Sequence, residues 1–249
     1  MKRTMVIAGV LATLLLSSLT CLAQSQSRSD ILKEIEAKRA ELVALEKSFL
    51  EPGEEDRSRY AEFLGQPDTG IIRLLPREKF DAEVYKDNKT TIGMRGGGAY
   101  YHFTSKTHAY GYGSDIELDH DQLMTGFAGA DYGMLTDLGD IPLESVGLET
   151  PAVTVLAAYK TPQEEPLARS EARRISQGAE LDGLAVKRRV PLKLNSTYLV
   201  RSINYRTSDV LVAFKVVRID SDGSAVLLWK LLKKYETPKL KPVEVVEIR

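Results

Sequence analysis

The alternation of apolar and polar residues is strongest near the C-terminus, where three strand-like segments follow one another. They are "STYLVRSINYR" (196–206), "SDVLVAFKVVRI" (208–219) and "SAVLLWKLLKKY" (224–235), and the tight-turn sequence "DSDG" joins the last two. In the middle segment both sets of alternate side chains are apolar, as in a strand that is covered on both faces. We therefore predict a three-stranded β-meander whose middle strand is central.

Shorter strand-like segments precede the meander, from residue 71 onward. Residues 90–95, 99–105, 115–119 and 122–127 are rich in β-forming residues and are separated by glycine or Asp/Asn turns. Residues 152–160 fit either a short helix or a buried strand, and residues 164–178 are typical of an exposed helix. The pattern predicts a β-rich α+β fold with a mainly antiparallel sheet, sandwich- or barrel-like, and the meander in its core.

Residues 30–50 repeat apolar side chains at three- and four-residue steps, which predicts an amphipathic helix. The repeat consists of Ile31, Ile35, Leu42, Leu45 and Phe49. Ser29 is placed to cap this helix, and Lys38 interrupts its apolar seam. Because three heptads are near the lower limit for a coiled coil, the pattern favours packing on the protein's own body over self-association. A second, short helix is predicted over 54–64, with Gly65 past its end.

The first 23 residues have the layout of a secretory signal peptide. Lys2 and Arg3 precede an apolar run up to Leu19, and small residues follow, with Ala23 before the expected cleavage point. Lipidation of Cys21 is the alternative, although Leu19 fits a lipoprotein site poorly. We expect export to the periplasm or the extracellular space, with no transmembrane span in the mature chain.

These patterns predict the organisation of the chain. It comprises a signal peptide at 1–23, a helical segment at 24–66, a β-rich body at 71–236 and a C-terminal tail at 237–249. Charge is uneven along it, since residues 24–183 carry 18 basic and 29 acidic side chains and residues 184–249 carry 14 and 6. Mutual packing of the two parts is the favoured interpretation, and a basic face that meets an anionic polymer or lipid surface is the alternative.

Residues 95–121 combine all three histidines with a triple glycine and several tyrosines. Glycines opposite aromatic rings relieve crowding in curved sheets, so a structural role is favoured. The functional alternative is an aromatic groove that stacks on sugars or holds a peptide. Its candidate residues are Tyr100, Tyr101, Tyr110, Tyr112, Tyr132 and Arg95.

A metal site is the second candidate in this region. His102 and His108, with a carboxylate from Asp115, Glu117 or Asp119, could supply three ligands to Zn²⁺ and leave one position for water. Their spacing matches none of the helical zinc signatures. We therefore predict no cofactor, with a divalent metal as the alternative.

Four acids of the same region alternate with other residues and so share one face of an extended chain. They are Asp115, Glu117, Asp119 and Asp121. A half-solvated strand face explains this row. Calcium could use the same hard oxygen ligands.

The function expected from these features is binding. We predict an exported, non-catalytic envelope or extracellular protein that binds a polysaccharide, peptide or protein through a Gly/Tyr-rich surface. One alternative is a metal-assisted hydrolase that uses His102, His108 and an acid from the row, so enzymatic activity stays open. Another is a structural protein that oligomerises through the N-terminal helix. "RGGG" lacks the flanking elements of a dinucleotide fingerprint and the aromatics of an RNA-recognition pattern, so no nucleic acid partner is expected.

Overall fold

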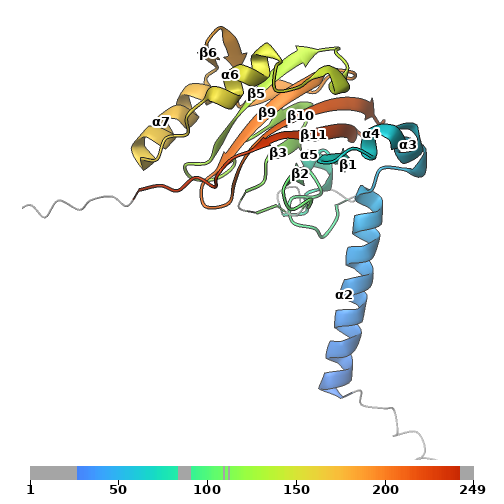
Figure 1. Cartoon of the computed structure of the whole chain (residues 1–249). Coiled ribbons are helices and arrows are strands. Elements are labelled where there is room, and N and C mark those ends of the chain that lie inside the picture. Colours follow the sequence, from blue (N-terminus) through green and yellow to red (C-terminus); the bar gives the residue numbers. More distant parts are fainter. Residues whose placement is uncertain (1–26, 84–90, 109, 112, 242–249) are drawn as a thin grey trace, which may run out of the picture. The chain divides into compact units, whose positions relative to one another are not determined.

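The computed structural model describes residues 27–83, 91–108, 110–111 and 113–241 (Figure 1). It divides the chain into two compact units, Met1–Leu45 and Glu46–Arg249, which are described separately. The predicted signal peptide, Cys21 and Tyr112 lie outside the described residues. None of the described helices is long and apolar enough to cross a membrane.

The described part of the first unit is helical. Helix α2 (Arg28–Leu50) begins there, and its last residues belong to the second unit. The cap is Ser27 rather than the predicted Ser29, because the Ser27 Oγ accepts a hydrogen bond from the backbone N–H of Asp30 at 3.2 Å. Ser29 already lies in the first helical turn.

The second unit is built from antiparallel strands and short helices. Its strands are β1 (Thr69–Leu74), β2 (Tyr100–Tyr101), β3 (Ile116–Asp119), β4 (Gln122–Met124), β5 (Tyr132–Gly139), β6 (Ala179–Leu181), β7 (Leu184–Val186), β8 (Arg189–Pro191), β9 (Thr197–Asn204), β10 (Ser208–Ile219) and β11 (Ala225–Lys234). Its helices are α3 (Glu54–Arg59), α4 (Ala61–Leu64), α5 (Arg77–Phe80), the 3-10 helix η1 (Leu143–Ser145), α6 (Pro151–Ala158) and α7 (Glu165–Ser176).

The predicted meander is confirmed as the centre of the main sheet. The five strands follow the order β1-β11-β10-β9-β5, so β10 is the middle strand. Val212 and Phe214 belong to the core on one face of β10, and Leu211 and Ala213 belong to the core on the other. The two apolar faces that the sequence shows are therefore both buried.

Each face of the main sheet has its own cover. The second sheet, β2-β3-β4-β8, shares a core with the first through Ile116, Leu118 and Leu123. Helices α6 and α7 contribute Leu156 and Ile175 to the core of the opposite face (Figure 1). The result is an α+β fold in three layers, with two antiparallel sheets packed as a sandwich, and a separate β6-β7 hairpin.

Three of the predicted strands are wrong or too long. The strand predicted over 122–127 ends at Met124, as β4. Within residues 91–95 the structure has only an isolated bridge at Ile92, and 99–105 shortens to β2. The triple glycine ends the segment at 91–95, because its φ angles are all positive, from 61° to 83°. A Cβ at Gly97 would come within 2.4 Å of the backbone nitrogen of Asp81, so only glycine allows this close turn. A turn at 103–106 ends the segment that begins at 99, where the backbone N–H of Lys106 donates to the carbonyl of His102 at 2.8 Å.

Other elements agree with the pattern. Residues 152–160, which fitted either a helix or a strand, form α6 with Pro151 at its start, a position that suits proline. The expected helix over 164–178 is α7, and Gly178 follows it with a φ of 90°. The short helix over 54–64 divides into α3 and α4 at Tyr60.

Candidate functional site

The tyrosines of the Gly/Tyr-rich region are mostly buried. Tyr100, Tyr101 and Tyr132 are 2, 5 and 3 % exposed, so these side chains cannot line an open stacking groove. Tyr110 is half-buried, with its ring 4.5 Å from that of Tyr100. Arg95 is exposed, with its guanidinium 5.0 Å from the ring of Tyr110. Among the described candidates, Tyr100, Tyr101 and Tyr132 are therefore core residues, and Tyr110 and Arg95 are the accessible ones.

The acid row is not one solvated strand face, because only Glu117 and Asp119 belong to β3, while Asp115 precedes it and Asp121 lies in the turn that follows. Asp115 and Glu117 are 0 and 2 % exposed, whereas Asp119 is half-buried and Asp121 is exposed. Polar groups from distant parts of the chain cover the buried pair. The alternating pattern therefore showed neither where the strand ends nor what packs against these acids.

Glu117 lies in a network with Tyr100 and Arg77. It accepts a hydrogen bond from the Tyr100 hydroxyl at 2.6 Å and another from Arg77 Nη1 at 3.1 Å. Burial raises the pKa of the Glu117 carboxyl, and the bonds from Tyr100 and Arg77 act in the opposite direction. The Glu117 carboxylate, the Tyr100 hydroxyl and the Arg77 guanidinium thus form hydrogen bonds with one another inside the protein.

Asp115 is held in a similar way. Its carboxylate accepts hydrogen bonds from the backbone N–H of Phe103 at 2.8 Å and from Asn204 Nδ2 at 3.1 Å. Burial raises the pKa of this carboxyl from 3.8 to about 7, against the lowering effect of bonds to Ser202, Phe103 and Asn204. These contacts tie β3 to the main sheet.

The predicted histidine ligands are not brought together. The Nε2–H of His108 donates to the backbone carbonyl of Arg73 at 2.8 Å, and burial lowers the pKa of His108 to about 4. His102 is 7 % exposed and forms a bridge with Thr107. Neither histidine joins a group of three potential ligands among the residues that the structure describes.

One group among the described residues does have the spacing of metal ligands. Ligand atoms of Glu78, Asp119 and His120 lie within 4.8 Å of one another. Hydrogen bonds of the β3–β4 turn account for this closeness, since the backbone N–H of His120 donates to Glu78 at 2.8 Å and its Nδ1 lies 3.1 Å from Asp119. We therefore treat this group as part of the turn.

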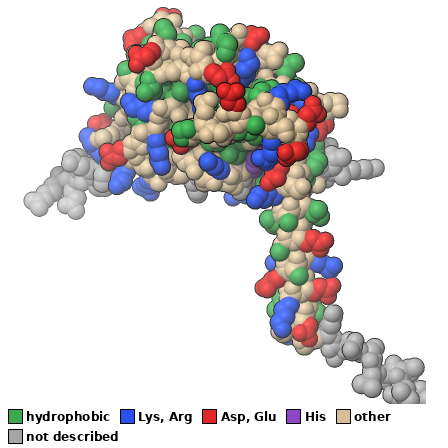
Figure 2. Space-filling model, turned by 45° about the vertical axis from the view of Figure 1, so that its right-hand side comes forward, with side chains coloured by type: hydrophobic (Ala, Val, Ile, Leu, Met, Phe, Trp, Pro, Cys, Tyr) green, Lys and Arg blue, Asp and Glu red, His purple; other side chains and the backbone are tan. Residues whose placement is uncertain are grey.

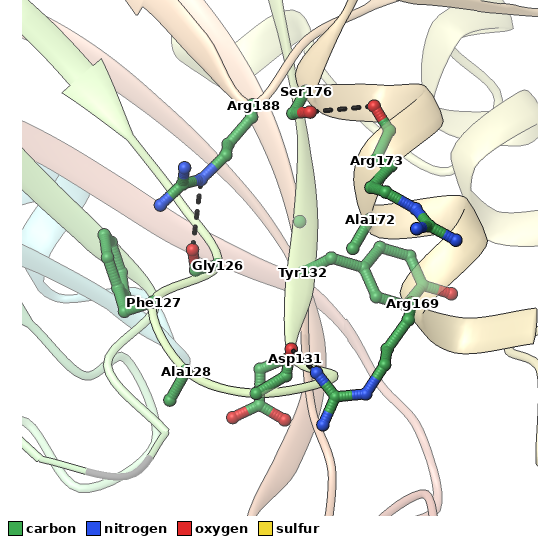
Figure 3. Close-up of a pocket in the computed structure, with 12 residues that line it drawn as sticks. Gly126, Phe127, Ala128, Asp131, Tyr132, Arg169, Ala172, Arg173, Ser176 and Arg188 are labelled. Carbon is green, nitrogen blue, oxygen red and sulfur yellow. Dashed lines mark hydrogen bonds between the residues drawn. The ribbon is translucent and has the colours of Figure 1, made fainter. Parts of the chain in front are cut away.

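A different site lies between the loop before β5 and helix α7 (Figure 3). The pocket has a volume of about 360 Å³, within the range of small-ligand sites. It is lined by Gly126, Phe127, Ala128, Gly129, Asp131, Tyr132, Gly133, Arg169, Ala172, Arg173, Ser176 and Arg188. Three arginines and one acid give this lining an excess of positive charge.

Arg188 is the best-positioned of the three arginines. Its Nε donates to the backbone carbonyls of Thr125 and Gly126, both at 3.1 Å (Figure 3 shows the bond to Gly126). Within the described part of the chain, its two Nη atoms have no hydrogen-bond partner. A guanidinium fixed through Nε presents these atoms as a fork that matches the two oxygens of a carboxylate.

The other two arginines come from α7. Arg169 pairs with Glu165 on the same helix, and its Nη1 donates to the backbone carbonyl of Gly129 at 3.3 Å. The guanidinium of Arg173 makes no hydrogen bond or ion pair with any residue that the structure describes. The pocket therefore contains cationic donors that the fold itself does not use.

The remaining walls are an acid and aromatic rings. Asp131 accepts a hydrogen bond from the backbone N–H of Tyr205 at 2.8 Å, and burial raises the pKa of its carboxyl. Phe127 is half-buried, and its ring lies 5.2 Å from that of Tyr100. Tyr132 is the predicted ligand-binding residue that lines the pocket, while its hydroxyl pairs with that of Tyr159 at 2.9 Å.

Sequence reasoning missed the arginines of this pocket. The pattern treated the helix over 164–178 only as exposed, and no motif links it to residue 188. The available signal was the cluster of glycines from 126 to 133 followed by an arginine-rich helix. No family model, curated protein or solved structure matches this chain. The function is consequently inferred from the residues of the pocket itself.

Proposed function

We propose that the chain is an exported, non-catalytic binding protein that holds an acidic sugar residue of an envelope or extracellular polysaccharide in this pocket. The observation that carries the proposal is the anchored guanidinium of Arg188, whose two Nη atoms have no partner among the described residues. A sugar carboxylate supplies the two acceptor oxygens that such a fork prefers.

The shape and composition of the lining support a sugar over a simple anion. The half-buried ring of Phe127 offers an apolar surface for the face of a sugar ring. The backbone of the glycine-rich loop can exchange hydrogen bonds with sugar hydroxyls. Arg173 adds positive charge beside the carboxylate, which strengthens the attraction at low salt.

Calorimetric titration with a uronic acid oligosaccharide tests this proposal. The matched ligand is the methyl ester of the same oligosaccharide, which keeps the ring and hydroxyls but removes the negative charge. We expect the acid form to bind and the ester to bind roughly tenfold more weakly or worse, as a charged hydrogen-bonded pair is lost.

Variants of Arg188 assign the binding to the pocket. R188A should weaken binding roughly ten- to a hundredfold, and R188K should give an intermediate loss because lysine keeps the charge without the fork. R59A is the control, since Arg59 is an exposed arginine of α3 that pairs with Glu55 and is not part of the lining. Equal losses in R188A and R59A would show that only overall charge matters.

Three results of these titrations would contradict recognition of an acidic sugar. Equal binding of the acid and its ester would refute carboxylate recognition. Binding of inorganic phosphate, without binding of the uronic acid, would reassign the pocket to phosphate groups. Absence of binding by all of these ligands would remove the proposed function.

A further inference from the structure

The first unit carries an unbroken three-four repeat of seam positions. Ile31, Ile35, Lys38, Leu42 and Leu45 follow one another at steps of four and three residues on α2, and Phe49 continues the series. This is the spacing of the a and d positions of a coiled coil. Figure 2 shows hydrophobic side chains exposed along this helix, among acidic and basic ones.

The apolar members of the seam are open to solvent. Ile31, Ile35, Leu42 and Leu45 are 42, 40, 51 and 62 % exposed. A helix of 23 residues with such a stripe gains stability when the stripe is buried against another helix. Phe49 is occupied differently, because its ring packs 5.9 Å from that of Phe80 in the second unit.

We propose that α2 associates with α2 of a second copy of this chain as a parallel, two-stranded coiled coil. Charges beside the seam decide the orientation. With Ile35 and Leu42 at a positions, Glu34 takes a g position and Arg39 takes the following e position. In a parallel pair Glu34 faces Arg39 of the partner subunit, and the pair occurs twice by symmetry. The next g position, Glu41, faces Glu46 of the partner subunit, and this like-charge pair offsets part of the attraction.

The antiparallel arrangement is disfavoured by the same charges. Centred on the same seam, it would place Arg39 opposite Arg39 of the partner subunit, and Glu41 opposite Glu41 of the partner subunit. Like charges in such positions are repulsive. The parallel arrangement brings the two copies of Lys38 together, but Lys38 lies 3.9 Å from Glu34 on its own helix, which offsets part of that charge.

Glu46 and Lys38 limit the strength of this seam. The Glu46 carboxylate accepts a hydrogen bond from the backbone N–H of Gly93 at 2.6 Å, so this e-position acid serves the second unit. A single polar residue in a seam lowers stability and restricts the number of strands and their register. Lys38 has this role here, and a weak, reversible dimer follows.

Light scattering coupled to size-exclusion chromatography tests the proposal over a micromolar to sub-millimolar concentration series. We expect the purified protein to reach twice the single-chain mass as its concentration rises. L42D should return it to the single-chain mass at every concentration. V43D is the matched control, since Val43 is 59 % exposed on the same helix but lies outside the seam, and it should leave the dimer intact.

Two further variants sharpen the result. K38L should shift the dimer to lower concentrations by roughly tenfold or more, because it completes the apolar seam. E34R alone should weaken the dimer, and E34R/R39E should restore it if the helices are parallel. Single-chain mass at every concentration, a dimer that survives L42D, or equal loss in L42D and V43D would each overturn the proposal. Thermal unfolding of each variant verifies that the second unit is folded.

Discussion

Two groups of charged side chains in the second unit have opposite relations to the fold. The carboxylates of Asp115 and Glu117 are buried and accept hydrogen bonds from Asn204, Tyr100 and Arg77. Arg188 lines the pocket, and its Nη atoms have no hydrogen-bond partner among the described residues. The first group is conspicuous in the sequence and serves stability, while the second is inconspicuous and has donors available for a ligand. The proposed function therefore rests on unused hydrogen-bonding capacity and not on a high density of reactive residue types.

The largest expected effect concerns the pH dependence of stability through Asp115. The folded protein keeps this carboxyl protonated up to about pH 7, whereas the unfolded chain loses the proton near 3.8. Both forms are protonated below the lower value, so stability is greatest there and falls as pH rises from about 4 to about 7. A shift of this size corresponds to on the order of 4 kcal/mol of unfolding free energy.

Urea unfolding of the wild type and D115N at several pH values measures this contribution. Asparagine does not titrate, so the difference between the two proteins should change by several kcal/mol across that interval. Taking the difference also removes the opposite effect of His108, whose lowered pKa costs stability as pH falls. A constant difference would mean that Asp115 is ionised in the folded protein throughout.

Loss of Arg77 should have the next largest effect. R77A leaves Glu117 buried without its cationic partner, and we expect a loss of about 3 kcal/mol in unfolding free energy. The double variant R77A/E117Q should recover part of it, because the uncompensated charge is gone. R188A should by contrast lose about 1 kcal/mol, since its bonds to two carbonyls are half-buried, and should instead lose ligand affinity.

The roles assigned to the two groups would be wrong if R77A lost ligand affinity and R188A lost stability. A stable R77A protein that no longer binds uronic acid would place the ligand site at Glu117. A strongly destabilised R188A protein would show that Arg188 is structural. Melting temperature and calorimetric affinity, measured on the same preparations, separate the two possibilities.

The sequence predicted what depends on local pattern. The alternation in 208–219 identified β10 as a strand covered on both faces, because both sets of its side chains are apolar. The same reasoning mistook the acid row for a solvated face. Arg77 lies 40 positions from Glu117 and Asn204 lies 89 positions from Asp115, so the groups that cover these acids become visible only when the chain is folded.

The pocket was not predicted either, because its residues also come together only when the chain is folded. Arg188 reaches the loop before β5 because Lys187 forms an antiparallel bridge with Leu135 and the backbone N–H of Thr125 donates to the carbonyl of Arg188. These pairings join three separate parts of the chain. A periodic pattern within one segment contains no information on them.

A prediction with an expected effect of intermediate size combines the α2 dimer with the arginine pocket. A dimer through α2 carries two arginine pockets, so a long polysaccharide chain can bind both, whereas a single uronic acid residue cannot. L42D should therefore weaken apparent affinity for the polymer at least tenfold and leave that for the short ligand unchanged. Surface-bound polymer and dissolved oligosaccharide provide the two measurements. Equal affinity of L42D and V43D for the polymer would mean that the pockets act singly.

The smallest expected effect tests the role of Asp131 inside the pocket. Burial raises the pKa of its carboxyl, so as pH falls through that raised value Asp131 becomes neutral before a sugar carboxylate does. Removal of this negative charge beside the arginines should strengthen uronic acid binding by a few-fold, because the site is partly open to solvent. D131N should bind with the higher affinity throughout and lose the pH dependence, while the amide oxygen of the new side chain can still accept the Tyr205 N–H. If D131N instead binds more weakly at every pH, Asp131 is an acceptor for a sugar hydroxyl rather than a source of repulsion.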